Sequence, residues 1–207
     1  MLTLLVLGVA VVFGVLVCVA LAWRRMRATP FGPARPIAKA EEGALVVVKG
    51  RVRLVGDALI APLSARRCAV SQVAIHSVAT HFRPVHTDVM ARDFVIEDAT
   101  GRALVRLGGA RARVNLRRPR RFDPPLPYDS DLVNRFLFRL RDLTGKWLHG
   151  QHLRYLEAAL VEGATVVVAG LARWEVDPDP IAWTGYRETP RRLVLSAPPD
   201  GALWLSD

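Results

Sequence analysis

Cysteine and lysine are both scarce in this sequence of 207 residues. Only two cysteines are present, and one of them, Cys18, lies in a long apolar segment. This number excludes a disulfide-stapled fold, and it excludes a thiolate zinc finger or RING, which needs about four to eight Cys and His ligands. Lysine supplies only three of the 29 basic side chains, so arginine accounts for most of the positive charge. The formal net charge of +10 is compatible with an anionic partner.

Charge is absent from the first 22 residues, and 19 of these residues are apolar. As a helix they would span about 33 Å, enough for a hydrocarbon core of about 30 Å. Trp23 and three arginines within residues 24–27 follow, so the positive-inside rule predicts a single-pass membrane helix with the remaining chain in the cytoplasm. A cleaved signal peptide is the alternative, but no basic region precedes the apolar run. Residues 23–42, which are basic and rich in proline, are predicted to be a juxtamembrane linker.

Residues 43–207 are predicted to form one mainly β domain. Apolar alternation and Val-rich runs predict strands over 44–55, 67–80, 93–97, 103–107, 111–116, 165–174, 191–196 and 202–205. Gly50 is expected to mark a bulge in the first strand. Residues 166–173 repeat the form of residues 46–53, three valines followed by one residue and a glycine. Short strands of this kind, two of them containing a glycine, favour a small OB-like barrel, and a β-sandwich is the alternative.

The spacing of apolar residues changes from that of a strand to that of a helix in an insert over about residues 130–161. Ser130 is a predicted N-cap, and apolar residues follow at helical spacing over 132–143 until Thr144-Gly145 ends the helix. A second helix is predicted over about 151–161. We expect the insert to cover one end of the barrel. A helix that lies on a membrane or docks onto a partner is the alternative.

Four segments carry a resemblance to a known family. They are Glu42-Gly43 leading into VVVKGRV, APLSARRC at 61–68, DFVIEDATGRALV at 93–105 and RYLEAALVEGATVVVAG at 154–170. In this order, beside an apolar segment, they resemble the GIDE-type or "beside a membrane" domain. That domain occurs in MULAN-type mitochondrial ubiquitin ligases and in many prokaryotic membrane proteins. The resemblance spans residues 40–175.

The resemblance implies a domain that recognises partners or substrates next to a membrane. The ligases also have a second transmembrane helix and a RING, and these 207 residues show neither, so we expect no ligase activity from this chain. A ligase-like component that works with a separate RING partner is the alternative. The family positions, which we expect to be structural, are Gly43, Gly50, Pro62, Ser64, Cys68, Asp98, Gly101, Arg154, Tyr155, Glu157, Gly163 and Gly170.

Some of these positions could also support chemistry. Cys68 would need a neighbouring base to act as a nucleophile, and no Cys-His pair is visible, so we expect a buried thiol. Glu97 and Asp98 could be an acid pair, but EDATG is typical of a hairpin turn, which we favour. We expect Arg154 and Glu157 to form an ion pair that holds a helix to the barrel.

Three histidines, His76, His81 and His86, are five residues apart, which suits neither a strand nor a helical metal site. We therefore predict no catalytic residue, no metal and no cofactor.

The segment 102–121 contains eight arginines and no acidic residue. Its possible partners are anionic lipid, an acidic protein face or nucleic acid. Nucleic acid is disfavoured because this segment contains no aromatic residue, and the first one after it is Phe122. A solvated loop is the alternative. We predict a noncatalytic recognition or adaptor domain at the membrane surface, and binding of anionic lipid or nucleic acid is a further alternative. The candidate contact residues are Arg111, Arg113, Arg117, Arg118, Arg120, Arg121, Phe136 and Leu140.

Overall fold

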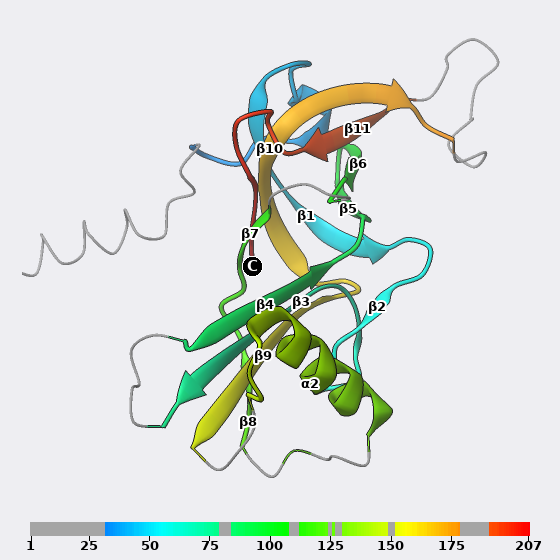
Figure 1. Ribbon diagram of the computed structural model, residues 1–207. Coiled ribbons are helices and arrows are strands. Elements are labelled where there is room, and N and C mark those ends of the chain that lie inside the picture. The colour runs from blue at the N-terminus through cyan, green and yellow to red at the C-terminus, as the bar shows by residue number, and fades with distance from the viewer. Residues whose placement is uncertain are drawn as a thin grey trace, which may run out of the picture. The chain divides into compact units, whose positions relative to one another are not determined.

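The computed structural model describes residues 32–78, 84–107, 112–123, 126, 130–148, 152–178 and 191–207. Residues Ala34–Asp207 form one compact unit. This unit is mainly β: five strands close into a barrel, a second sheet packs beside it, and one short helix covers a face of the second sheet (Figure 1).

The barrel strands follow the order β1-β5-β6-β11-β10, and β1 also pairs with β10, which closes the ring. The β6–β11 pair is parallel and the other four pairs of the ring are antiparallel. Strands β12 and β7 continue the sheet from β10. The bounds are β1 Leu45–Leu54, β5 Phe94–Asp98, β6 Gly101–Val105, β7 Ala112–Asn115, β10 Thr165–Val176, β11 Arg191–Ser196 and β12 Leu203–Ser206.

The second sheet has the order β2-β3-β9-β8, and β4 also pairs with β3. Helix α2 lies in front of this sheet in Figure 1, away from the barrel. The bounds are β2 Leu59–Ile60, β3 Arg67–Ser77, β4 His86–Ala91, β8 Arg120–Phe122, α2 Asp131–Thr144 and β9 Leu153–Val161.

The repeated Val-rich segments form the seam that closes the barrel. Val46 pairs with Gly170, and Gly50 pairs with Val166, so a local two-fold axis relates the two copies of the repeat. The pairing runs without interruption from Leu45 to Arg51. The bulge predicted at Gly50 is therefore wrong.

The two glycines of the repeat allow a close approach between strands. A Cβ atom on Gly50 would lie 2.8 Å from the backbone oxygen of Glu97, and one on Gly170 would lie 2.8 Å from that of Ser196. Next to Gly50, β1 changes its partner from β10 to β5 at Arg51. Glycine is needed where each strand curves from one neighbour to the next, as barrel closure requires.

The fold class predicted from the sequence, a membrane-spanning helix followed by a small barrel with a helical insert, is wrong as stated. Within the described residues, no helix is both long and apolar enough to cross a membrane. Residues 1–22, where that helix was predicted, lie outside the described residues. The described chain adds a complete second sheet to the five-stranded barrel, and α2 is its one short α-helix.

The insert contains one helix and one long strand. The helix predicted over 132–143 forms as α2, and Gly145 ends it in the left-handed conformation with φ of 68°. The second predicted helix is wrong, because residues 153–161 form strand β9 at the centre of the second sheet. The side chains of β9 alternate between two cores: Tyr155 lies in the core under α2, and Ala158 and Leu160 lie in the barrel core. A strand buried on both faces lacks the polar alternation that would distinguish it from a helix.

The predicted linker is partly folded. A short 3-10 helix, η1 (Ile37–Lys39), packs against the barrel, and the Ile37 side chain is fully buried in the barrel core. The Ile37 backbone N–H donates to Asp98 Oδ2 at 2.8 Å, and the Arg35 N–H donates to the Val47 carbonyl at 2.8 Å. Residues 35–40 therefore belong to the compact unit.

Helix α2 is fixed to the second sheet by apolar packing and by an ion pair. Val133, Phe136, Leu137 and Leu140 face Val73, Ile75 and Tyr155 of the sheet. Beside them, Arg139 pairs with the buried carboxylate of Asp88 on β4. Burial raises the pKa of Asp88, and the nearby positive charges of Arg139 and His86 oppose this shift.

Candidate functional site

Two of the four family-like segments meet at a buried carboxylate in the second sheet. Glu157 on β9 is fully buried, and its two oxygens accept hydrogen bonds from the backbone N–H groups of Leu63 at 2.8 Å and Ser64 at 3.0 Å. Ala65 in the same turn has a positive φ of 54°. APLSARRC and RYLE thus form one structural unit, in which Glu157 holds the turn that begins at Pro62.

Cys68 follows that turn and is fully buried in β3. Burial raises the pKa of its thiol to about 11, and the negative charge of Glu157 adds to the shift. The thiolate needed for nucleophilic catalysis is therefore very rare near neutral pH. This agrees with the interpretation of Cys68 as a buried structural residue.

The predicted Arg154–Glu157 ion pair does not form, because both residues lie on a strand. Residues three apart share a face on a helix but lie on opposite faces of a strand. Arg154 instead reaches Asp123, with Nε 3.4 Å from the carboxylate. Tyr155 is fully buried, and its hydroxyl donates to the Leu148 carbonyl at 2.7 Å, which fixes the chain after α2.

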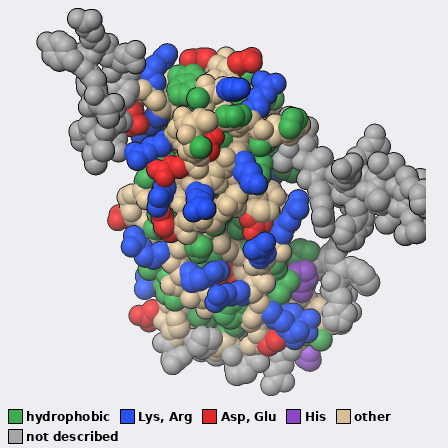
Figure 2. Space-filling model, turned by 180° about the vertical axis from the view of Figure 1, so that it is seen from behind, with side chains coloured by type: hydrophobic (Ala, Val, Ile, Leu, Met, Phe, Trp, Pro, Cys, Tyr) green, Lys and Arg blue, Asp and Glu red, His purple; other side chains and the backbone are tan. Residues whose placement is uncertain are grey.

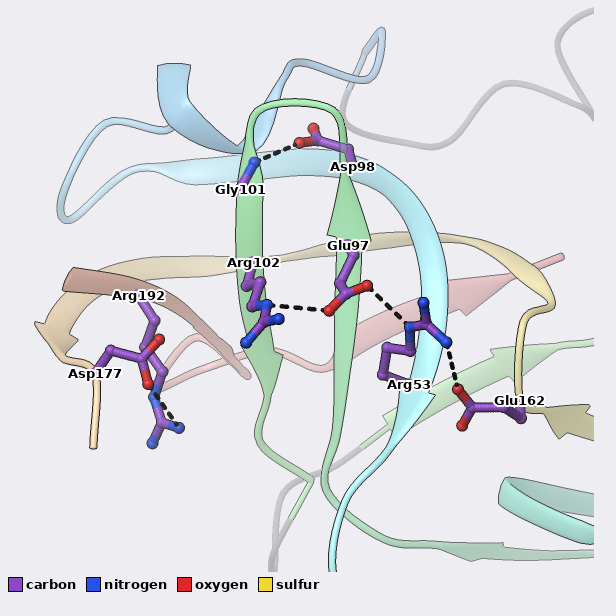
Figure 3. A network of polar contacts seen from close by, with 8 residues as sticks. All are labelled: Arg53, Glu97, Asp98, Gly101, Arg102, Glu162, Asp177 and Arg192. Atoms are coloured by element: carbon purple, nitrogen blue, oxygen red, sulfur yellow. Dashed lines mark hydrogen bonds and ion pairs between the residues drawn. The ribbon is translucent and has the colours of Figure 1, made fainter. Parts of the chain in front are cut away.

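Asp98 closes the β5–β6 hairpin, as expected for a turn. It accepts hydrogen bonds from the backbone N–H groups of Ile37, Thr100 and Gly101 and from the Thr100 hydroxyl. Burial raises the pKa of Asp98, but these hydrogen bonds outweigh burial and lower it. Glu97 points away from Asp98 in Figure 3 and pairs with arginines on both sides. The two carboxylates therefore do not act as a pair.

The remaining family positions are turn glycines. Gly43 and Gly163 both have φ of 75°, which glycine adopts without strain. The Gly43 N–H donates to the Ala172 carbonyl at 2.9 Å, and the Gly163 N–H donates to the Val52 carbonyl at 2.8 Å. Both turns fasten the ends of the seam strands β1 and β10.

The two described histidines of this set, His76 and His86, do not lie together as metal ligands would. His86 pairs with Ile75 across β3 and β4, so His76 lies on the opposite face of the sheet. His81 lies outside the described residues. No group of three or more His, Cys, Asp or Glu side chains in the described ranges could hold a metal ion.

The arginine-rich segment forms strands and contributes to a basic surface. Part of it is β7 and β8, which join the barrel sheet and the second sheet respectively. The Arg113 guanidinium lies 5.1 Å from the Trp204 ring centroid, and Arg121 pairs with Asp123 at 2.7 Å. Arg117, Arg118 and Arg120 are exposed, and Arg111 lies outside the described residues. Figure 2 shows Lys and Arg side chains over both the barrel and the second sheet on the face opposite α2.

Helix α2 presents different side chains from those expected. Phe136 and Leu140, the predicted contacts, lie in the core under the helix with exposures of 3% and 0%. On the outer side, the Phe138 and Trp147 rings meet edge to face, with centroids 5.4 Å apart, and each side chain is 49% exposed. The Arg141 guanidinium lies 5.1 Å from the Phe138 centroid and 5.0 Å from the Trp147 centroid. We call these three residues the aromatic cluster.

The aromatic cluster could not be predicted from the apolar periodicity of the sequence. Phe136, Leu137 and Phe138 are consecutive, so only the position of the buried stripe decides which aromatic ring faces outward. Trp147 lies beyond the helix and comes back to Phe138 only after the turn at Gly145. Phe138 lies three residues before Arg141, and residues at this spacing are neighbours on a helix surface. This spacing is the sequence feature from which the contact between Phe138 and Arg141 could be predicted.

No protein-family model, curated protein or solved structure matches this chain. The resemblance to the GIDE-type domain therefore stays a prediction.

Proposed function

We propose that this protein is a recognition module that binds another protein through the aromatic cluster at the end of α2. The observation that carries this proposal is the exposure of Phe138 and Trp147 on either side of Arg141. Tryptophan and arginine are the side chains most enriched among residues that dominate protein–protein affinity. Aromatic rings and arginine are also enriched in protein interfaces generally.

The cluster is already ordered before a partner arrives. Arg141 contacts both rings, and its guanidinium donates to Asp142 at 2.9 Å, which limits its rotation. Phe138 lies on a helix whose opposite side is anchored in the core. Binding a partner therefore costs little side-chain entropy in the cluster itself.

The charge around the cluster indicates the kind of partner. Arg135, Arg141 and Lys146 outnumber the acidic residues Asp131 and Asp142 on this part of the surface, and the whole chain has a net charge of +10. We therefore infer a partner surface that places an apolar side chain between the rings and acidic groups around it. A membrane location for this interaction stays a prediction from residues 1–27.

A crosslinking pull-down from native extract, at low and high salt, tests the proposal. We expect a specific protein to be captured by the wild type at both salt concentrations and lost by the Phe138→Ser/Trp147→Ser double variant. Val89→Ser is the matched control, because Val89 is an apolar residue with 40% exposure on β4. The captured protein is then purified, and its affinity for each form of this chain is measured. We expect the Kd of its complex with the double variant to be at least about tenfold higher than the Kd of its complex with the wild type.

Two results would overturn the proposal. One is a partner that binds the double variant as tightly as the wild type. The other is that the wild type recovers only lipid or nucleic acid, that it does so at low salt only, and that this binding is lost when the four arginines within residues 117–121 are replaced by serine. That result would assign the function to the basic surface, because binding through phosphate contacts falls steeply with salt.

A further inference from the structure

Two hollows on the surface of the protein share one lining residue, Val55. The first has a volume of about 430 Å³ and lies over β1, β5, β6 and the start of β11. The second has a volume of about 450 Å³ and lies between the end of β1 and the residues that connect β4 to β5. We call the two together the barrel groove. It is separate from the aromatic cluster and shares no residue with it.

The floor of the groove is apolar. Val95 on β5 and Leu104 on β6 are cross-strand partners, and both line the first hollow. Val55 is 40% exposed, and Ala91 lines the second hollow beyond it. Apolar side chains on the outer surface of a barrel, surrounded by polar ones, are typical of a binding groove.

Charged side chains of both signs surround this floor. Glu97 accepts from Arg53 Nε at 2.9 Å and from Arg102 Nε at 3.0 Å, and Figure 3 shows this chain of contacts along β1, β5 and β6. Arg192 and Asp177 stand on the far side of β6, with their nearest charged atoms 3.9 Å apart.

The charges that line the groove cancel. The second hollow adds Arg92, Asp57 and Asp93 to the charged residues of the first. The two hollows together are lined by four arginines and four carboxylates, although the whole chain has a net charge of +10. Carboxylates lie among the arginines in both hollows, so the groove offers no continuous positive surface for nucleic acid or another polyanion.

We propose that the barrel groove binds an extended polypeptide segment of a partner protein. Apolar side chains on one side of the segment would occupy the two hollows, and charged side chains of both signs would pair with the walls. An extended chain presents every second side chain to the same face, which suits two adjoining apolar hollows with charged walls. The segment would carry a basic residue near Asp57, an exposed acidic residue that lines the second hollow.

Peptides selected on the full-length protein from a phage-displayed library of short random sequences are the probe. Their affinities are measured by fluorescence anisotropy. We expect Val55→Ser to weaken binding about five- to tenfold and Asp57→Lys to weaken most strongly the peptides that carry a basic residue. Leu45→Ser is the control, because Leu45 is 51% exposed at the other end of β1. Both test positions are on the surface, and thermal unfolding of each variant shows that it is folded.

Three outcomes would overturn the inference. Selected peptides could bind Val55→Ser and Asp57→Lys as tightly as the wild type. An oligothymidylate could displace them, which would show that the groove accepts a polyanion. The Phe138→Ser/Trp147→Ser variant could abolish their binding while Val55→Ser retained it. This last result would assign peptide binding to the aromatic cluster and would leave the proposed function standing without the groove.

Discussion

Replacing Glu157 with glutamine tests whether a single buried carboxylate holds the turn at residues 61–66. The wild-type side chain is fully buried and accepts two backbone N–H groups, at 2.8 and 3.0 Å. Glutamine keeps one carbonyl oxygen but presents an amide donor to the other N–H. One of the two hydrogen bonds must therefore be lost, and one backbone donor of the half-buried turn is left without its acceptor.

The expected magnitude follows from these contacts. A hydrogen bond to a charged group contributes about 1.5–3 kcal/mol, and an unsatisfied buried donor costs about 1–3 kcal/mol. Burying a neutral amide costs less than burying a carboxylate, which offsets part of this loss. We expect the free energy of unfolding to fall by about 2 kcal/mol. In a chain of this length, such a change lowers Tm by about 4–8 °C.

Urea denaturation followed by tryptophan fluorescence, together with thermal unfolding, measures this effect. Glu162→Gln is the matched control, because Glu162 also accepts a backbone N–H, that of Leu54, at 2.6 Å. Its side chain is 47% exposed, so water can replace the lost contact, and we expect a change below about 1 kcal/mol. A Glu157→Gln variant within about 0.5 kcal/mol of the wild type would refute the reasoning. Equal destabilisation by both substitutions would refute it as well.

Two further predictions concern titratable groups. In a Cys18→Ser background, we expect the Cys68 thiol to react with iodoacetamide about a hundredfold more slowly in the folded protein than in the urea-unfolded protein. The reason is that burial raises the pKa of this thiol to about 11. Similar reaction rates in the two states would contradict this prediction. Hydrogen bonds lower the pKa of Asp98 despite its burial, so its contribution to stability is present above the unfolded-state pKa of about 3.9 and is lost as the pH falls through the folded-state pKa. The stability advantage of the wild type over Asp98→Asn, measured by urea denaturation, should therefore be full at neutral pH and shrink below about pH 4; a difference independent of pH would show that the charge of Asp98 does not contribute.

Several local features could be predicted from the sequence because they depend on neighbouring residues only. The α2 helix follows from apolar spacing and from a glycine that ends it. The Asp98 turn follows from the side-chain and backbone preferences of EDATG. The Val-rich repeat is also visible in the sequence. The sequence does not show that its two copies pair with each other to form the antiparallel seam of the barrel. The pairing joins residues between 114 and 126 positions apart, and no local pattern encodes that distance.

The errors arose where two elements far apart in the sequence share a core. Strand β9 has apolar residues on both faces because one face packs on the barrel and the other packs under α2, and this pattern also fits a helix. A helix over these residues would place Arg154 and Glu157 on the same face, which is why the sequence predicts an ion pair between them. On the actual strand they lie on opposite faces, and Glu157 binds the turn at Leu63 and Ser64 instead.

The candidate sites depended still more on tertiary structure. Sequence composition alone determined the arginine excess, the scarcity of cysteine and the apolar segment at residues 1–22, because these are sums or runs along the chain. Only the fold decided that Phe136 is buried while Phe138 is exposed, because the orientation of α2 is set by the sheet beneath it. Only the fold brought Trp147 to Arg141, and only the fold balanced four arginines with four carboxylates around one groove. Such surfaces are assembled from separate strands, so they exist only after the barrel has closed.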